Sequence, residues 1–181
     1  MVPKFVSSEV MFKGKKLNVE RQTFSLGENN DSHVVEVLNF EIPRSVAILP
    51  ITEFGNILLE KHYRYAPRKE LLEIPAGWIE KGENPAEAAK RELMEETGFS
   101  PRKMTNLGTI LPASGYSNEQ LFIFVARLRE NSGGNQHLEK GEEISLVSYP
   151  KDRVRRMIKS GEITDPMTIC AVFRASLRGL Y

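Results

Sequence analysis

Three glutamates, Glu92, Glu95 and Glu96, stand within a short segment that we expect to be helical. At about 100° per residue, Glu92 and Glu96 lie about 40° apart on one face, and Glu95 widens the acidic arc to about 100°. The apolar Ala89 and Leu93 lie beside this arc, whereas an ordinary amphipathic helix carries its acids opposite the apolar stripe. Carboxylates at the edge of a core repel one another and are costly to bury unpaired. A divalent cation resolves this conflict, because hard Mg²⁺ prefers carboxylate oxygens and keeps water or phosphate as its other ligands.

Such a metal-binding face predicts hydrolysis of a diphosphate linkage. Metal ions that bridge two phosphates offset the negative charge that repels water, and they lower the pKa of a bound water. A nearby carboxylate can then accept the proton. The alternative is an acidic helix face that only contacts solvent, which is the usual role of a run of charges.

The helix that carries the glutamates has start and stop signals in the sequence. Asn84 is a suitable N-cap, Pro85 suits the first helical position, and Glu87 completes a capping box. Gly98 stands where a C-terminal glycine ends a helix. Gly77 precedes the helix, and we expect a tight backbone turn there.

The remaining chain predicts a mixed α/β or α+β fold with a mixed sheet. Breaks are expected at residues 13–15, 28–32, 53–56 and 132–135. Strands are expected at residues 6–12, 16–26, 34–42, 45–50, 57–63, 71–74, 104–111, 121–128 and 144–147. Helices are expected at residues 152–158 and 166–178, the second with Asp165 as its cap, Pro166 at its first position and an apolar face of Ile169, Val172, Phe173 and Leu177.

The segment from residue 77 to residue 99 resembles the box of the Nudix family without a gap. Its matching positions are Gly77, Glu83, Arg91, Glu92, Leu93, Glu95, Glu96, Gly98 and Phe99. A pattern of this length arises by chance at roughly 10⁻⁸ per start position. The resemblance implies a Nudix α/β/α sandwich (domain 44–181) and hydrolysis of nucleoside diphosphates linked to another moiety. Residues 1–43 are then expected to form a small N-terminal antiparallel β extension.

The resemblance also implies roles for single residues. The carbonyl of Ala76 and the carboxylates of Glu92 and Glu96 would hold Mg²⁺, with Mn²⁺ or another divalent cation as an alternative. Glu95 would be a ligand or would activate water. The supporting positions are Gly77, Glu83 and Arg91, of which Arg91 would orient a box carboxylate.

Two flanking segments are similar to the ADP-ribose pyrophosphatase branch of the family. Residues 62–77 carry a Tyr-Arg pair and a Leu-Glu-Ile-Pro-Ala-Gly lead into the box, and residues 111–120 form a proline-containing loop that reaches Glu119. In that branch the loop commonly reads Ser-Pro-Gly, whereas this chain has Ala113-Ser114-Gly115. The preferred distal sugar therefore stays open.

Three residues outside the box are assigned by this similarity to substrate binding or catalysis. Arg64 would contact a substrate phosphate through its forked donors. Glu73 would lie near the substrate or metal, and Glu119 would be a base or bind the activated water. The alternatives are a surface arginine for Arg64, a strand-end charge for Glu73 and a solvated loop acid for Glu119. We thus expect cleavage of ADP-ribose to AMP and ribose 5-phosphate, with another dinucleotide or nucleotide sugar (a diadenosine polyphosphate, NADH), a damaged nucleoside triphosphate, or a catalytically silent nucleotide sensor as alternatives.

The composition limits which binding partners and which cellular compartment we expect. The 181 residues carry a net charge of +1, so we expect no broad attraction to nucleic acid or to a membrane, and a small nucleotide diphosphate as the substrate. The single cysteine, Cys170, excludes an intrachain disulfide and favours a reducing compartment, and with no secretory signal evident we expect a cytoplasmic protein. His33, His62 and His137 show no ligand spacing and are expected to be structural or surface residues. The N-terminal strands are expected to join two subunits in a homodimer.

Overall fold

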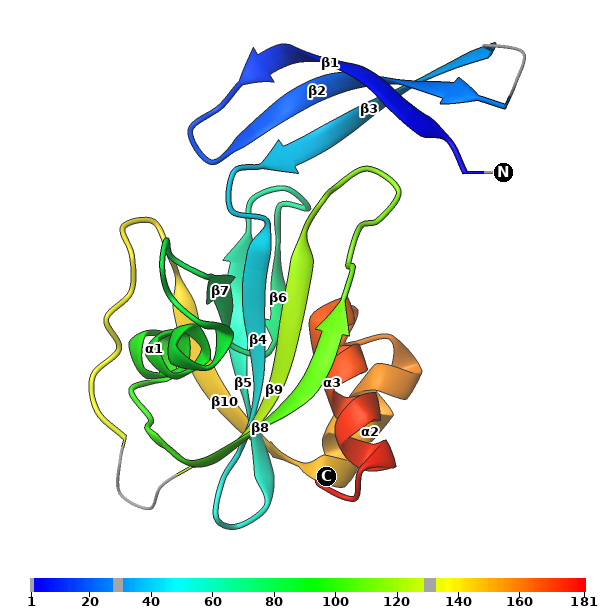
Figure 1. The fold of residues 1–181 in the computed structure, drawn as a ribbon. Coiled ribbons are helices and arrows are strands. Elements are labelled where there is room, and N and C mark those ends of the chain that lie inside the picture. Colours follow the sequence, from blue (N-terminus) through cyan, green and yellow to red (C-terminus); the bar gives the residue numbers. More distant parts are fainter. Residues whose placement is uncertain (1, 28–30, 129–132) are drawn as a thin grey trace. The chain divides into compact units, whose positions relative to one another are not determined.

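The computed structural model describes residues 2–27, 31–128 and 133–181, and Figure 1 shows its fold. The chain forms two compact units, one of Met1–Pro43 with Leu111–Gln120 and the other of Arg44–Ile110 with Leu121–Tyr181. The loop before β9 thus groups with the N-terminal strands, although it lies far from them in sequence. The expected breaks at residues 28–32 and 132–135 lie partly outside the described residues.

The first unit is built on a three-stranded antiparallel sheet, in the order β1-β2-β3. Its strands are β1 (Lys4–Lys13), β2 (Leu17–Leu26) and β3 (Asp31–Phe40). Glu20 on β2 accepts hydrogen bonds from Ser8 Oγ on β1 and Asn39 Nδ2 on β3, each at 2.6 Å. These bonds lower the pKa of Glu20, because they stabilise its charged form. The predicted N-terminal antiparallel extension is confirmed.

The second unit contains a seven-stranded sheet with the order β10-β5-β4-β9-β8, where β6 also pairs with β5 and β7 with β4. Its strands are β4 (Arg44–Ile51), β5 (Asn56–Arg64), β6 (Lys69–Glu73), β7 (Ala76–Trp78), β8 (Pro101–Ile110), β9 (Gln120–Leu128) and β10 (Ile144–Pro150). Its helices are α1 (Pro85–Thr97), α2 (Lys151–Ser160) and α3 (Pro166–Leu177).

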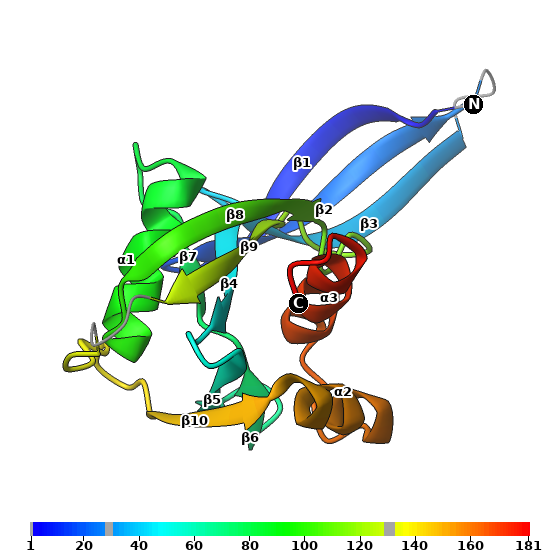
Figure 2. The same ribbon diagram turned by 90° about the horizontal axis from the view of Figure 1, so that it is seen from below.

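Helices cover both faces of this sheet (Figures 1 and 2). Successive side chains of a strand point to opposite faces. On β4, Val46 and Ile48 pack toward α1 with Leu93, whereas Leu49 packs on the other face in the core that Ala171 of α3 joins. The predicted α/β/α sandwich with a mixed sheet is therefore confirmed.

The caps of α1 and α3 follow the sequence signals. Asn84 Oδ1 accepts hydrogen bonds from the N–H groups of Ala86 and Glu87 at 3.0 Å, and the Glu87 side chain completes the capping box. Gly98 ends α1 in the left-handed conformation, with φ of 72°. Asp165 accepts from the N–H of Thr168 at 2.7 Å and caps α3.

Two local predictions were wrong. The buried residues of α3 are Thr168, Ala171, Val172 and Ala175. Phe173 and Leu177 are instead 62% and 71% exposed, because the face with small residues is the one that lies against the sheet. Gly77 is not in a tight turn, since it lies within the short strand β7, which the sequence did not predict.

Candidate metal and active site

The glutamates of α1 lie beside β7, which precedes the helix in the chain. Glu96 is buried, and its Oε2 accepts a hydrogen bond from the N–H of Ala76 at 2.8 Å. The Glu92 side chain is 12% exposed and that of Glu95 is 40% exposed. Helix and strand together thus place Glu96 against the Ala76 backbone and Glu92 against Gly77, with the more open Glu95 on the same helix.

Arg91 connects four groups of this site. Its Nε and Nη2 donate to the two oxygens of Glu83 at 3.1 and 3.0 Å. Its Nη1 donates to Glu92 Oε1 at 2.8 Å and to Glu95 Oε2 at 2.9 Å. Its Nη2 also donates to the Trp78 carbonyl at 2.9 Å. Hydrogen bonds to Glu83 raise the pKa of Arg91, so the guanidinium remains a fixed positive charge that orients the carboxylates.

Gly77 permits the close approach of β7 to α1. A Cβ atom on this residue would lie 2.1 Å from both Cδ and Oε1 of Glu92. Any side chain at this position would therefore push the Glu92 carboxyl group away from its present place. Absence of a side chain, not a special backbone angle, is what the site requires at residue 77.

The box carboxylates are electrostatically strained without a cation. Burial raises the pKa of Glu92 to about 7, although Arg91 opposes the shift. Burial, together with the charges of Glu60 and Glu92, raises the pKa of Glu96 well above its ordinary value. Arg91 alone does not compensate this charge, and the donors are all oxygens. The residues therefore fit a hard divalent cation such as Mg²⁺.

A further carboxylate, which the sequence did not indicate, acts on this site through its charge. Glu142, which follows a turn just before β10, raises the pKa values of Glu60, Glu92 and Glu96. Its Oε2 accepts a hydrogen bond from the N–H of Glu139 at 2.8 Å. The acidic pair at residues 142–143, directly before a strand, was the only sequence signal that could have indicated it.

Arg64 and Glu73, both expected near the substrate, form an ion pair. Arg64 Nη2 lies 2.6 Å from Glu73 Oε1, and the Arg64 side chain remains 34% exposed. The β5–β6 register sets Glu60 opposite Glu73 and Lys69 opposite Arg64, so Arg64 reaches Glu73 along the strands and not from the facing position. The buried His62 also reaches Glu73, with Nδ1 3.0 Å from the same oxygen.

Glu119 belongs to the compact unit that also holds the N-terminal strands. Its N–H donates to Ser117 Oγ at 3.1 Å. The neighbouring Asn118 accepts a hydrogen bond from the Phe40 N–H at 3.0 Å, so this loop is held to the end of β3. A role for Glu119 remains a prediction from the sequence.

The box geometry agrees with what comparison with known proteins shows. The NUDIX domain family matches residues 41–165. The chain belongs to the Nudix family. An ADP-ribose pyrophosphatase of Bacillus subtilis (strain 168) is 28% identical to this Nudix chain over 169 residues, which cover 93% of the chain and 90% of the relative. A methanol dehydrogenase activator of Bacillus methanolicus is 32% identical over 174 residues, with 93% and 90% covered.

A solved structure also shares the fold of the Nudix chain. The crystal structure of an ADP compounds hydrolase matches with a TM-score of 0.86 and 22% identity, covering 100% of this chain and 98% of the other. The predicted resemblance to the Nudix family and its ADP-ribose pyrophosphatases is thus confirmed, and the chain is a Nudix hydrolase. No helix in the described part of the chain has both the length and the apolar character needed to cross a bilayer.

Proposed function

We propose that this Nudix hydrolase cleaves the diphosphate linkage of ADP-ribose and releases AMP and ribose 5-phosphate. The observation that carries the proposal is the joining of the box carboxylates, on α1, with Ala76 of β7 in one sheltered site. The similarity to an ADP-ribose pyrophosphatase over nearly the whole chain supports the substrate.

In this proposal Glu92, Glu96 and the Ala76 carbonyl hold Mg²⁺, with Mn²⁺ as an alternative. The bound metal would offset phosphate charge and lower the pKa of the attacking water. Arg91 holds Glu92 and Glu95 in place, and Glu83 in turn holds Arg91. Burial of Glu96 excludes water from one side of the site, so its charge acts with little screening.

Arg64 is the proposed substrate contact. Its guanidinium is partly exposed and offers several donors, of which Nη2 lies near Glu73. Glu73 therefore orients Arg64, while the other donors are suited to a phosphate oxygen. Glu95, Glu119 and Glu142 are the candidates for the group that accepts the proton of water. Glu95 is more exposed than the other two glutamates of the box helix, Glu92 and Glu96.

The activity is tested with a panel of substrates and the purified chain. AMP formation would be measured from ADP-ribose, NADH, diadenosine polyphosphates and nucleotide sugars, each with and without Mg²⁺. We expect metal-dependent preference for ADP-ribose. Preference for another dinucleotide or nucleotide sugar would replace the proposed substrate and keep the box chemistry. Absence of turnover with every substrate and metal would contradict the proposal as a whole.

We further propose that the chain acts as a cytoplasmic homodimer joined through residues 1–43. All of β1 is exposed in the single chain, and it carries apolar side chains that are usually covered in a stable protein. Phe5, Val10 and Phe12 are 59%, 53% and 61% exposed. A second copy of the extension would cover this surface, and the unpaired edge of β1 favours such pairing.

A further inference from the structure

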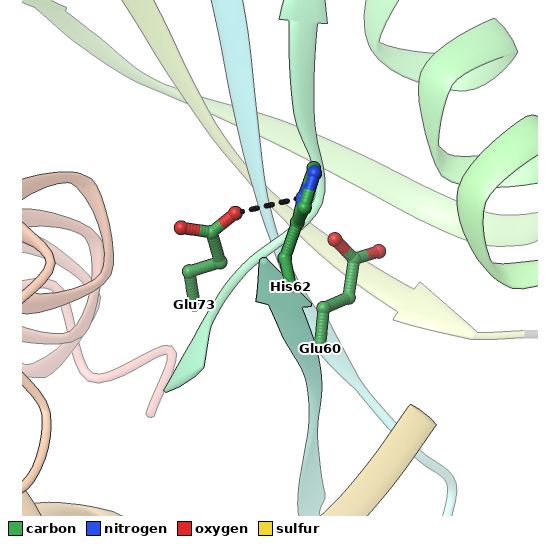
Figure 3. Close-up of side chains that lie close together, drawn as sticks. All are labelled: Glu60, His62 and Glu73. Atoms are coloured by element: carbon green, nitrogen blue, oxygen red, sulfur yellow. Dashed lines mark ion pairs between the residues drawn. The ribbon is translucent and has the colours of Figure 1, made fainter. Parts of the chain in front are cut away.

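Three buried side chains outside the box converge between β5 and β6. They are Glu60, His62 and Glu73, which we call the β5–β6 triad, and Figure 3 shows them as sticks. Glu60 pairs directly with Glu73 across the two strands, and His62 follows Glu60 by two residues on the same face of β5. In the view of Figure 3 the imidazole lies between the two carboxylates.

The triad is almost inaccessible to solvent. Glu60 is 0%, His62 6% and Glu73 1% exposed. Neither carboxylate oxygen of Glu60 has a hydrogen-bond partner within the described residues. A buried carboxylate without a partner is costly, and like charges directly opposite each other in a sheet destabilise it. Glu60 must therefore be neutralised, either by a proton or by a bound cation.

The protein supplies little positive charge for this purpose. Arg64 forms an ion pair with Glu73. Among the groups that most affect the pKa of Glu60, Arg64 is the single cation, and its charge lowers that pKa. Burial and then the charge of Glu73 act against it, followed by Glu142 and Glu92. One guanidinium thus faces several carboxylates. Within the described residues, Arg64 forms its ion pair with Glu73 and none with Glu60.

We propose that the β5–β6 triad binds a divalent transition-metal ion through donors other than the carboxylates of the Nudix box. One atom from each side chain can be chosen so that all lie within 4.8 Å of one another. Metal–ligand bonds of about 2.0–2.2 Å place two donors of one ion up to about 4.4 Å apart, so only small side-chain movements are needed. The ion would also neutralise the facing carboxylates.

The donor set indicates which ion is bound. The box offers only oxygen donors and suits Mg²⁺, whereas the triad adds an imidazole nitrogen to two carboxylates. Imidazole favours Mn²⁺, Fe²⁺, Co²⁺ or Zn²⁺ over Mg²⁺. The chain would therefore hold two classes of metal site, and excess Mg²⁺ would fill the box without displacing the ion of the triad.

The test is direct detection of a histidine nitrogen on bound Mn²⁺. Electron spin-echo spectra would be recorded on the full-length wild-type chain with limiting Mn²⁺ and excess Mg²⁺, and on the Glu92→Gln/Glu96→Gln variant with Mn²⁺ alone. We expect ¹⁴N coupling from imidazole in both samples. His62→Gln should abolish the coupling and weaken Mn²⁺ binding by about tenfold or more.

His33→Gln is the matched control, because His33 is exposed on β3. It should retain the nitrogen coupling. If His62→Gln does not fold, Glu60→Gln provides the second variant, and it should weaken Mn²⁺ binding while the box still binds Mg²⁺. No nitrogen coupling in the wild type, or coupling that persists in His62→Gln, would overturn the proposal and leave a protonated Glu60 as the compensated state. These readouts do not depend on whether ADP-ribose is the substrate.

Discussion

At residue 77 the backbone of β7 passes so close to Glu92 that a Cβ atom would lie within 2.4 Å of three atoms of the carboxyl group. Contacts of this length do not occur between non-bonded atoms, so Glu92 and a side chain at residue 77 exclude each other. Arg91 also donates a hydrogen bond to Glu92 through Nη1. The position of the Glu92 carboxylate therefore depends on the lack of a side chain at Gly77 and on the hydrogen bond from Arg91.

Gly77→Ala should consequently move Glu92 and weaken metal binding at the box. We expect the Mg²⁺ affinity to fall by about tenfold or more. The fold should be retained, because the Glu92 carboxyl group is the far end of a flexible side chain and can move. Isothermal titration with Mg²⁺ measures the effect. Gly115→Ala is the control, since nothing lies within 4 Å of a Cβ at that residue. Equal affinities in the two variants would contradict the argument.

Glu96→Gln should lower turnover by about two orders of magnitude or more, because it removes a metal-binding charge and keeps the shape of the side chain. The neutral amide also relieves the buried charge, so we expect little loss of stability. Steady-state AMP release measures turnover, and thermal unfolding measures stability. Glu162→Gln, on an exposed residue after α2, should leave both unchanged. Near-normal turnover of the Glu96 variant would refute its role.

At the scale of secondary-structure elements, the caps of α1 stabilise the helix and thereby fix the positions of the box residues that it carries. The helix begins with a full capping box at Asn84 and ends at the left-handed Gly98. Only one face of the helix is buried, through Ala88, Ala89 and Leu93. Fraying at the N-terminal end would reach Arg91 within about two turns, so the cap contributes to site geometry as well as to stability.

Asn84→Ala should therefore lower the free energy of unfolding by about 1 kcal/mol, because two N–H groups lose their acceptor. Urea denaturation at neutral pH would measure the change. Lys90→Ala is a matched substitution on the exposed side of the same helix, and it should change the free energy by less than about 0.5 kcal/mol. Equal effects of the two substitutions would argue against the capping contribution.

At the scale of the whole molecule, the buried carboxylates link stability to pH and to metal. Because the folded chain raises the pKa of Glu92 to about 7, the metal-free folded state binds more protons than the unfolded state. Its free energy of unfolding therefore falls as pH rises from about 4 to 7. Bound metal offsets this loss, since it requires the deprotonated carboxylates.

The increase in Tm caused by Mg²⁺ should thus be small at pH 5 and larger at pH 8. Differential scanning calorimetry at constant ionic strength would record it. In Glu92→Gln/Glu96→Gln the increase should be reduced at both pH values. A wild-type increase that does not vary with pH would show that these carboxylates are not the groups that bind the metal.

The exposed β1 surface leads to a prediction about assembly. The chain should be a dimer at micromolar concentration, and Val10→Lys should shift it toward monomer, because a charge on a buried contact is costly. Light scattering coupled to size exclusion would measure the mass. Phe54→Lys, at an apolar residue that is 85% exposed in the β4–β5 turn, is the control and should remain dimeric. A wild-type monomer would rule out the proposed assembly.

Local interactions explain why much of the fold followed from sequence. The capping box of α1 uses residues within three positions of each other, and strands such as β4 show their apolar character in consecutive residues. The box itself is one continuous segment, so its residue types and spacing indicated metal chemistry and the Nudix fold without coordinates.

Other features depend on contacts between residues distant in the chain. The β5–β6 register alone places Glu60 and His62 beside Glu73, a relation that histidine spacing does not reveal. The buried face of α3 was decided by how closely Ala171 and Ala175 approach the sheet, not by the bulk of Phe173. By itself the sequence determined most of the elements, the caps of α1 and α3 and the carboxylates of the box, because those signals are local. Only the tertiary structure decided which charges are buried together, because burial and strand register arise from pairing across the whole chain.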